Sequence, residues 1–518
     1  MIDRSPANPT YRWLTTIIVM CGSFMVVLDA TVVIIALPKI MADFGVNINK
    51  IQWIITAYML TMAIMMPSVG WLSQRLGNRG LFLVSLAIFT AASVLCGTAW
   101  NINALILFRV LQGFGAGLIM PIAMAIIFEA FPVERRGMAM GIYGLGATFG
   151  PVIGPTLGGY LTEKFSWHLI FLINIPVGLV AIVLAAWILP GGTTRKGLHF
   201  DVWGFVTMAV GLGCLLMGLS QGRQEGWTSI YILGLFGVAL AALAVFLRVE
   251  LTSSHPFIDL RVYKNFTYTM ATTVFIIQGI GLFGSTYLIP LFFETILKYS
   301  PLETGLLMLP MAVVVSITLP LSGRLTDRID VRIPIGLGVT CAVLSLFWLS
   351  FLNMGTSSVD GIGMLIMRGF GIGFIFPPIM NSALRSLPQE KVAIGSGLMN
   401  VSRQLGGAFG VAFLGTVLEH RQFQYESIFL KAQGLASYAA NSALPSVQTW
   451  SNSPGAAHQG TATLHALVAQ KAMVASYDDT FLLAAGIFAL AILPTILLRS
   501  RRLNSSHSGS DQPPGATP

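Results

Sequence analysis

Charged residues are scarce in this chain. Lys, Arg, Asp and Glu make up 10% of its 518 residues, whereas 55% of the residues are apolar. Soluble domains carry about 25% charged residues, so the composition excludes a water-covered enzyme or a series of soluble domains. It predicts instead an all-α body that spans the lipid bilayer many times.

Residues suited to metal, redox or nucleotide chemistry are missing as well. The four cysteines (Cys21, Cys96, Cys214 and Cys341) lie inside apolar runs and form no CxxC pair, so we expect neither disulfides nor a metal site. The seven histidines fall in expected loops, span ends or the C-terminal tail. No Gly-Lys dipeptide occurs, which excludes a P-loop and argues against ATP as the energy source. We therefore expect no cofactor.

Long apolar runs dominate what is present. A helix needs roughly 20 apolar residues to cross a bilayer. On this criterion we expect fourteen spans, at residues 14–37, 52–72, 80–99, 104–127, 138–161, 169–189, 202–220, 228–247, 268–292, 303–322, 333–352, 361–383, 393–418 and 479–498.

The distribution of positive charge tests this count. With an even number of spans, nineteen of the 30 Lys and Arg residues fall on the side that carries both termini, eight on the other side and three inside spans. Positive residues accumulate on the cytoplasmic side, so both termini are predicted to be cytoplasmic. The net charge of +9 then reflects topology, and no basic patch indicates a nucleic-acid partner.

The chain contains an internal repeat. Three pairs of segments recur at separations of 253 to 259 residues: 70–75 with 323–328, 109–115 with 368–371, and 137 onward with 395 onward. Such repeats are typical of transporters, which bind cargo at the repeat interface. The expected parts are a cytoplasmic N-terminus (1–13), a six-helix repeat (14–190), two inserted spans with linkers (191–264), a second six-helix repeat (265–502) with an extracytoplasmic loop at 419–478, and a disordered tail (503–518).

Several motifs resemble those of one family, the major facilitator superfamily, in its fourteen-span branch of drug:proton antiporters of the EmrB/QacA type. The resemblance covers roughly residues 15–500. It rests on Leu28-Asp29-Ala30-Thr31 with Ala36-Leu37-Pro38, on Gly70 to Arg79, on Arg109 with Gln112-Gly113, on Gly146, Gly150-Pro151, Gly154-Pro155 and Gly158-Gly159, and on Trp167 to Gly178 (WHLIFLINIPVG).

The resemblance implies the major facilitator fold, two six-helix repeats plus two inserted helices, and a gate at the loop after the second span. Gln74 stands where this loop usually has an acid, whereas the second copy keeps Asp327 but has Asp330 in place of glycine. Gating therefore rests either on the second copy, with Asp327 and Arg328, or on Glu129 meeting Arg75 or Arg79.

Asp29 is the only acid well inside an expected span. A charge at the centre of a helix in lipid costs roughly 2.5–3.5 kcal/mol, so it has to face the protein interior or a cavity. Asp29 and Arg109 lie at similar depths, roughly 12 Å and 8 Å from the outer ends of their helices, so we expect them to meet. The pair is either a proton carrier coupled to export or a permanent ion pair that fixes helix packing.

The expected spans also hold excess positive charge. Arg109, Arg368 and Arg403 face a single intramembrane Asp, so the cavity is predicted to favour neutral or anionic lipophiles over cations, unless each Arg only binds backbone carbonyls or span ends. Further candidates for the cavity lining are Gln112, Phe275, Gln278, Phe283, Tyr287, Trp53 and Tyr58, although aromatics in spans often face lipid or pack.

Two segments leave alternatives open. The fifth span, with Gly150, Pro151, Gly154 and Pro155, is either a pliable gate helix or a closely packed one. The polar segment 419–478 is either a flexible loop, with an amphipathic helix at 423–436, or a docking surface. The resemblance implies as partners a periplasmic adaptor and an outer-membrane channel in a two-membrane bacterium.

These observations predict a non-enzymatic multi-pass protein of the cytoplasmic (inner) membrane, in contact with the lipid bilayer. It would use the proton motive force to export hydrophobic small molecules by alternating access. Two alternatives are an uptake symporter for a polar nutrient, which would need more polar side chains inside the spans, and a receptor or scaffold without transport.

Overall fold

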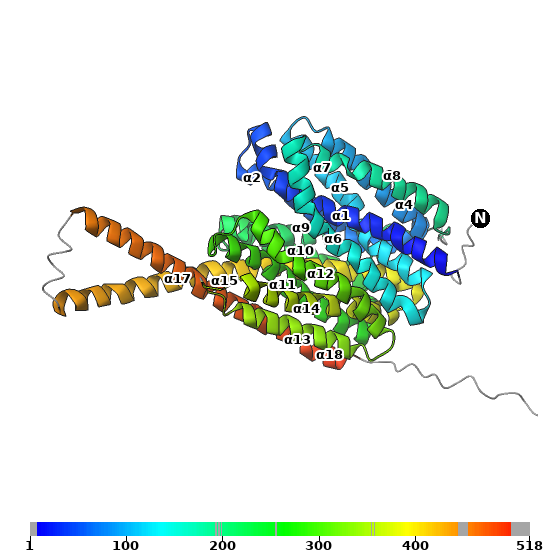
Figure 1. Cartoon of the computed structure of the whole chain (residues 1–518). Coiled ribbons are helices and arrows are strands. Elements are labelled where there is room, and N and C mark those ends of the chain that lie inside the picture. Colours follow the sequence, from blue (N-terminus) through cyan, green and yellow to red (C-terminus); the bar gives the residue numbers. More distant parts are fainter. Residues whose placement is uncertain are drawn as a thin grey trace, which may run out of the picture.

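The computed structural model describes residues 8–498 apart from 192–193, 195–196, 198, 254–255, 354, 357 and 444–453. This part of the chain consists of helices and short connections (Figure 1), with no strand among the described residues. Helices satisfy every backbone group within one segment, which is the requirement for crossing lipid.

The first half of the chain forms one bundle of helices. Within it α1 packs on α5 and α6, α3 packs on α5, and α4 packs on α5 and α8. Its elements are α1 (Pro9–Phe44), α2 (Ile48–Ile51), α3 (Trp53–Met65), η1 (Met66–Ser68), α4 (Val69–Gly97), α5 (Ile102–Ala130), η2 (Val133–Arg135), α6 (Arg136–Lys164), α7 (Leu169–Leu172) and α8 (Asn174–Ile188).

Two inserted helices and a second bundle follow. α9 and α10 pack on each other, and in the second bundle α11 packs on α15 and α14, α12 on α14, and α13 on α14 and α17. The elements are α9 (Val202–Glu225), α10 (Ile230–Thr252), η3 (Leu260–Lys264), α11 (Phe266–Thr295), α12 (Pro301–Thr326), α13 (Arg332–Leu349), α14 (Ser358–Arg385), η4 (Gln389–Lys391), α15 (Val392–Ala443), α17 (Pro454–Ala489) and α18 (Ile492–Leu497).

Twelve helical segments of the described chain are long and apolar enough to cross a membrane. One of them, 48–97, is 50 residues long and is interrupted at Gly77, whose φ of 73° and ψ of 157° are not helical. α6 has 29 residues but is not among the twelve. Large apolar side chains such as Leu240 and Trp187 are exposed on the outside of the body, as lipid-facing residues are.

The segment expected to be a polar loop is largely helical. α15 runs for 52 residues, roughly 78 Å at the usual rise, and α17 returns for 36 residues. The amphipathic helix expected at 423–436 lies within α15. Figure 1 shows the two helices projecting beyond the bundle, so the interpretation of 419–478 as a flexible loop is wrong for its described part. We call this end of the body the hairpin end.

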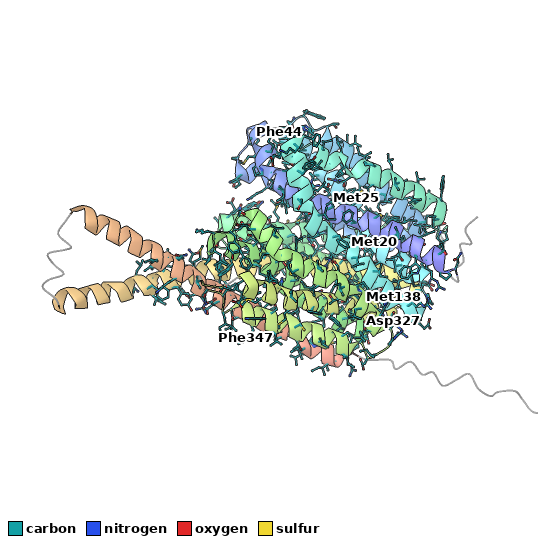
Figure 2. All side chains as sticks on the ribbon, in the orientation of Figure 1. Met20, Met25, Phe44, Met138, Asp327 and Phe347 are labelled. Carbon is teal, nitrogen blue, oxygen red and sulfur yellow. The ribbon has the colours of Figure 1, made fainter. Side chains whose placement is uncertain are left out.

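The opposite end carries the first turn of α1 and the end of α18 (Figure 1), and we call it the terminal end. Figure 2 places Met138 and Asp327 at this end and Phe44 at the other. The two bundles meet through α6 with α12 and α14, and through α5 with α15. The repeat is visible here, because Gly323 packs on the backbone of Gly137 while Gly70 packs on Ile394.

Candidate functional site

Asp29 and Arg109 are in direct contact inside the first bundle. Arg109 Nη1 on α5 forms an ion pair with Asp29 Oδ2 on α1, and each residue is only 1% exposed. The meeting expected from their depths is therefore confirmed. Because both charges are removed from water, they are stable only as a pair with further hydrogen bonds.

Those further hydrogen bonds are present. Asp29 Oδ1 accepts from Gln112 Nε2 and from Asn174 Nδ2, both at 2.9 Å. Gln112 Nε2 also lies 2.7 Å from Ser93 Oγ, and its Oε1 accepts from Arg109 Nη1 at 2.6 Å. All five side chains are buried. We call Asp29, Ser93, Arg109, Gln112 and Asn174 the Asp29 cluster.

An aromatic wall covers the guanidinium of Arg109. Its Cζ lies 3.9 Å from the centroid of the Tyr58 ring, and its Nε donates to the backbone oxygen of Ile54 at 3.2 Å. The Tyr58 hydroxyl donates to Val26 O at 3.3 Å. Tyr58 was expected to line a cavity, but it is fully buried and packs on Arg109. Trp53, at the start of α3, is half-buried.

The sequence did not single out two members of the Asp29 cluster. Asn174 lies in the WHLIFLINIPVG segment and Ser93 in the third expected span. A polar residue inside an apolar run is a signal for each. Which buried acid such a residue meets depends on the rotation of its helix, and the sequence alone does not give that rotation.

Arg368 occupies the position of Arg109 in the second copy, but it has different partners. Its Nη2 donates to Leu282 O at 3.1 Å and to Thr286 Oγ1 at 3.0 Å, and its Nε is buried without a partner. Within the described chain it has no carboxylate partner. Arg368 thus binds a backbone carbonyl and a hydroxyl group, and its role in a cargo cavity stays a prediction.

Arg403 on α15 lies among phenylalanine rings. Its Cζ is 5.4 Å from the ring centroid of Phe275 and 5.7 Å from those of Phe283 and Phe376. Ring faces attract a guanidinium, and no carboxylate of the described residues forms an ion pair with it. Phe275 is fully buried in this contact, so it packs on Arg403.

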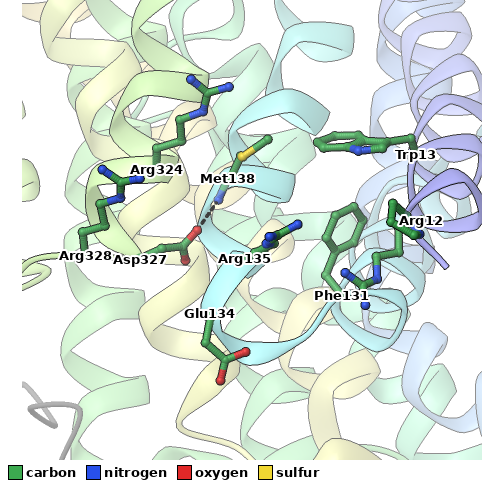
Figure 3. Close-up of a pocket in the computed structure, with 10 residues that line it drawn as sticks. Arg12, Trp13, Phe131, Glu134, Arg135, Met138, Arg324, Asp327 and Arg328 are labelled. Carbon is green, nitrogen blue, oxygen red and sulfur yellow. Dashed lines mark hydrogen bonds between the residues drawn. The ribbon is translucent and has the colours of Figure 1, made fainter. Parts of the chain in front are cut away.

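At the terminal end, Asp327 forms hydrogen bonds across the interface between the two bundles. Its Oδ1 accepts from the backbone N–H of Gly137 at 2.8 Å, and its Oδ2 from that of Met138 at 2.9 Å. These amides belong to the first turn of α6 in the other bundle, where a helix favours negative charge. Figure 3 shows Asp327 pointing at Met138. Asp327 from the second repeat copy therefore links the two bundles.

A cavity of about 400 Å³ lies beside this link. Figure 3 shows arginines from both bundles around it, among them Arg12, Arg135 and Arg328. Arg328 therefore lines this cavity. Two more contacts join the bundles nearby, from Ser396 Oγ to Pro121 O at 2.9 Å and from Asn400 Nδ2 to Met124 Sδ at 3.4 Å.

The alternative gate at Glu129 is not formed. Glu129 Oε2 accepts from Asn78 Nδ2 at 2.8 Å, whereas the Arg75 guanidinium lies over the Trp71 ring at 5.4 Å. Arg79 donates to the backbone oxygen of Ala186. In the described chain no ion pair joins Glu129 to Arg75 or Arg79, so the expectation that they meet is wrong for this conformation.

The glycines of α6 pack closely on α1. A Cβ at Gly150 would lie 2.7 Å from Val27 Cγ1, and one at Gly154 would overlap Thr31 Oγ1. Pro151 is exposed, and the side chain of Pro155 lies outside the described residues. Close packing of this helix is confirmed, and its role as a gate stays a prediction.

A second cavity, of about 510 Å³, lies nearer the hairpin end between α3, α9, α11 and α15. Phe283 and Tyr287 line it, as expected for cavity residues. Gln278 and Phe275, on the same helix, do not, since both are buried against the second bundle.

Comparison with known proteins gives one family. A family model described as Major Facilitator Superfamily matches residues 19–411. The multidrug transporter protein MdtP of Bacillus subtilis is 34% identical over 399 residues, covering 77% of this chain and 74% of that protein. The multidrug export protein EmrB of Haemophilus influenzae is 32% identical over 403 residues, covering 77% of this chain and 79% of that protein.

A solved structure shows the same fold. The human organic anion transporter MFSD10 (TETRAN) superimposes with a TM-score of 0.62 over 94% of this chain and 100% of that chain, at 13% sequence identity. At this identity the likeness concerns the fold alone.

Proposed function

This chain belongs to the major facilitator superfamily, and on that premise we propose that it exports hydrophobic small molecules in exchange for protons. The names of its relatives MdtP and EmrB support a cargo of this kind. The proposed mechanism is alternating access, in which the two bundles open in turn at the terminal end and at the hairpin end.

The observation that carries the proposal is the Asp29 cluster. Asp29 is a buried carboxylate with three side-chain donors: Arg109, Gln112 and Asn174. Protonation of Asp29 would cancel its charge and release Arg109. Arg109 would keep two acceptors, Gln112 Oε1 and Ile54 O, so its charge stays hydrogen-bonded. The cluster can thus exist with or without the proton, which a carrier requires.

The contacts at the terminal end support the alternating part of the proposal. Asp327 and the close backbone contact of Gly137 with Gly323 hold the bundles together there. These contacts bridge parts that are distant in sequence, so they can break without unfolding either bundle. We infer that cargo reaches its site from this end once they break.

Fourteen spans with both ends cytoplasmic fit these features. The break at Gly77 divides segment 48–97 into two helices, and α6 is one more long helix beside the twelve. The first turn of α1 and the end of α18 lie at the same end of the body in Figure 1, as an even count demands. The excess of Lys and Arg on that side supports a cytoplasmic location for it.

The proposal is tested with Asp29→Asn in proteoliposomes that carry a pH gradient. We expect the variant to insert normally but to lose both cargo export and the coupled proton movement. Ordinary antiport by the variant would remove Asp29 from the mechanism. Cargo and protons moving in the same direction would instead support the uptake symporter, and no movement of either by the unmodified chain would support a receptor or scaffold.

The partner at the hairpin end stays a prediction. The projecting helices α15 and α17 offer an elongated surface beyond the bundle (Figure 1), which fits a periplasmic adaptor better than a loop does. Co-purification of the adaptor with the full chain, lost on deletion of residues 430–470, would support this partner.

A further inference from the structure

The cavity at the hairpin end is separate from the Asp29 cluster, since none of the cluster's five residues lines it. One of its walls is α9, an inserted helix that belongs to neither repeat copy. Its volume of about 510 Å³ is within the range of small-molecule sites, roughly 300–1,000 Å³. The apolar walls include Met59, Leu60, Leu216, Leu219, Phe283 and Val411.

One end of the cavity is polar but has no net charge. Arg223 Nε donates to Glu419 Oε1 at 3.2 Å, and Arg223 Nη1 donates to the Tyr287 hydroxyl at 2.9 Å. The opposite charges of Arg223 and Glu419 therefore cancel, and this end of the cavity has no net charge. The remaining polar lining consists of uncharged side chains such as Gln404 and Thr56. A charged ligand would have to displace one member of the pair, whereas an uncharged hydrogen-bonding group would not.

Two glycines on one face of α15 shape this cavity. A Cβ at Gly407 would lie 2.5 Å from Cδ2 of Phe283, and a Cβ at Gly415 would lie 2.6 Å from Nη1 of Arg223. The residues are eight positions apart, about two helical turns, so they share a face. The absence of both side chains lets the Phe283 ring and the Arg223 guanidinium lie against α15.

α9 and the loop that follows it, which contains Trp227, are attached to both bundles beside the cavity. Gln224 Nε2 donates to Gln52 Oε1, at the start of α3, at 3.1 Å. Trp227 Nε1 donates to Thr416 Oγ1 on α15 at 3.0 Å. The cavity therefore lies between parts of the protein that alternating access would move relative to one another.

We propose that this cavity binds an uncharged amphiphile, with its apolar body against Leu219 and Phe283 and its polar group at Arg223 and Tyr287. The inference deepens the proposed function and rests on it only for the statement that the bound molecule is cargo. The same chemistry is offered by a free small molecule and by a neutral membrane lipid, and the two are separated below.

The test measures binding without transport. The probe is the neutral fluorophore N-phenyl-1-naphthylamine, added to the full chain in phosphatidylcholine nanodiscs, with empty nanodiscs as background. Leu219→Trp fills the cavity and should weaken saturable binding at least tenfold. Val210→Trp lies on the exposed side of the same helix and should stay within twofold of the unmodified chain. Val411→Trp fills the cavity from α15 and replaces the first variant if that one does not fold.

A second measurement identifies the occupant. Mass spectrometry then compares the lipids that co-purify in detergent with the two variants. We expect no lipid to be bound to Val210→Trp and absent from Leu219→Trp. If such a lipid is found, the bound amphiphile is a membrane lipid, and the assignment of the cavity to cargo is overturned. Unchanged dye binding in both filling variants overturns the site itself. Asp29→Asn should bind the dye normally, so failure of the proton-coupled function is distinguishable from failure of this site.

Discussion

The side-chain amide of Asn174 donates to Oδ1 of Asp29 at 2.9 Å. Asn174 is the first residue of α8, and Asp29 lies in the middle of α1, so this bond joins the sixth expected span to the first. It gives the carboxylate a donor that is independent of Arg109 and Gln112. The ionised form of Asp29 therefore depends on three helices being in register.

Asn174→Ala is predicted to destabilise the ionised form of Asp29 and the packing of α8 on α1. Loss of one donor to a buried charged acceptor costs about 1–3 kcal/mol, so the thermal unfolding midpoint should fall and proton-coupled export should drop at least severalfold. The control is Asn101→Ala, which removes a helix cap at Ala104 N but touches no member of the Asp29 cluster. That variant should lose some stability and keep its coupling. Export at the normal rate by Asn174→Ala would contradict the prediction.

The sequence predicted part of this site because depth in the membrane can be read from position along a span. Asp29 and Arg109 were placed at the same level in this way, and they meet. Asn174 and Ser93 were missed because contact between helices also depends on their rotation. For the same reason Tyr58 and Phe275, assigned to a cavity, pack on arginines instead.

The expected gate illustrates a second limit of prediction from the sequence. The loop motif occurs in both repeat copies, so it predicts a gate at either of them. Which copy forms the hydrogen bond depends on the side chain at the position of the acid. Asp327 reaches the first turn of α6, while Gln74 stands at the equivalent position of the first copy. Glu129 accepts a hydrogen bond from the side-chain amide of Asn78. The expectation that it pairs with Arg75 or Arg79 considered only opposite charges and therefore missed this neutral partner.

Asp327→Ala should loosen the terminal end. The change leaves the N–H groups of Gly137 and Met138 without their acceptor, which costs about 0.5–2 kcal/mol for a helix N-terminus. The readout is maleimide labelling of a Ser396→Cys variant, because Ser396 is fully buried at the same interface. Labelling should become several times faster when Asp327→Ala is added.

A matched control uses the neighbouring acid. Among the described residues, Asp330 Oδ1 accepts a local bond from Arg332 N at 3.0 Å and none from the other bundle, so Asp330→Asn should leave the labelling rate unchanged. The chain without Ser396→Cys measures the contribution of the native cysteines. Equal rates for Asp327→Ala and Asp330→Asn would show that Asp327 does not hold the bundles together.

Closure of the terminal end should also depend on pH. Burial raises the pKa of Asp327 and is the largest effect. The backbone hydrogen bonds from Met138 and Gly137 and the charge of Arg385 lower this pKa, and the charge of Glu134 raises it, so that the pKa stays above its ordinary value. The closed state therefore holds the proton more tightly than an open state in which Asp327 meets water. This contribution to closure is present at low pH and is lost as the pH rises through the raised pKa.

Lowering the pH at this end should accordingly slow labelling of the Ser396→Cys variant by more than it slows labelling of free glutathione, whose thiolate fraction falls by itself. Adding Asp327→Ala should remove this excess over the free thiol, because the carboxyl group that titrates at the interface is gone. Labelling that speeds up relative to glutathione at low pH, in the chain that retains Asp327, would contradict this prediction.

Gly141→Ala tests whether the two bundles have to touch at the backbone. A Cβ at Gly141 would overlap the carbonyl oxygen of Leu319 on α12 and lie 2.9 Å from its carbonyl carbon. Neither atom can move without shifting a helix, so the variant should insert normally, label faster at Ser396→Cys and lose at least tenfold in export rate.

Gly159→Ala is the control on the same helix, because its nearest neighbour would be Ile35 Cγ2 at 3.9 Å. Both changes raise helix propensity equally, so any difference between them comes from the contact with α12. Full export activity in Gly141→Ala would show that the observed contact is not part of the transport cycle.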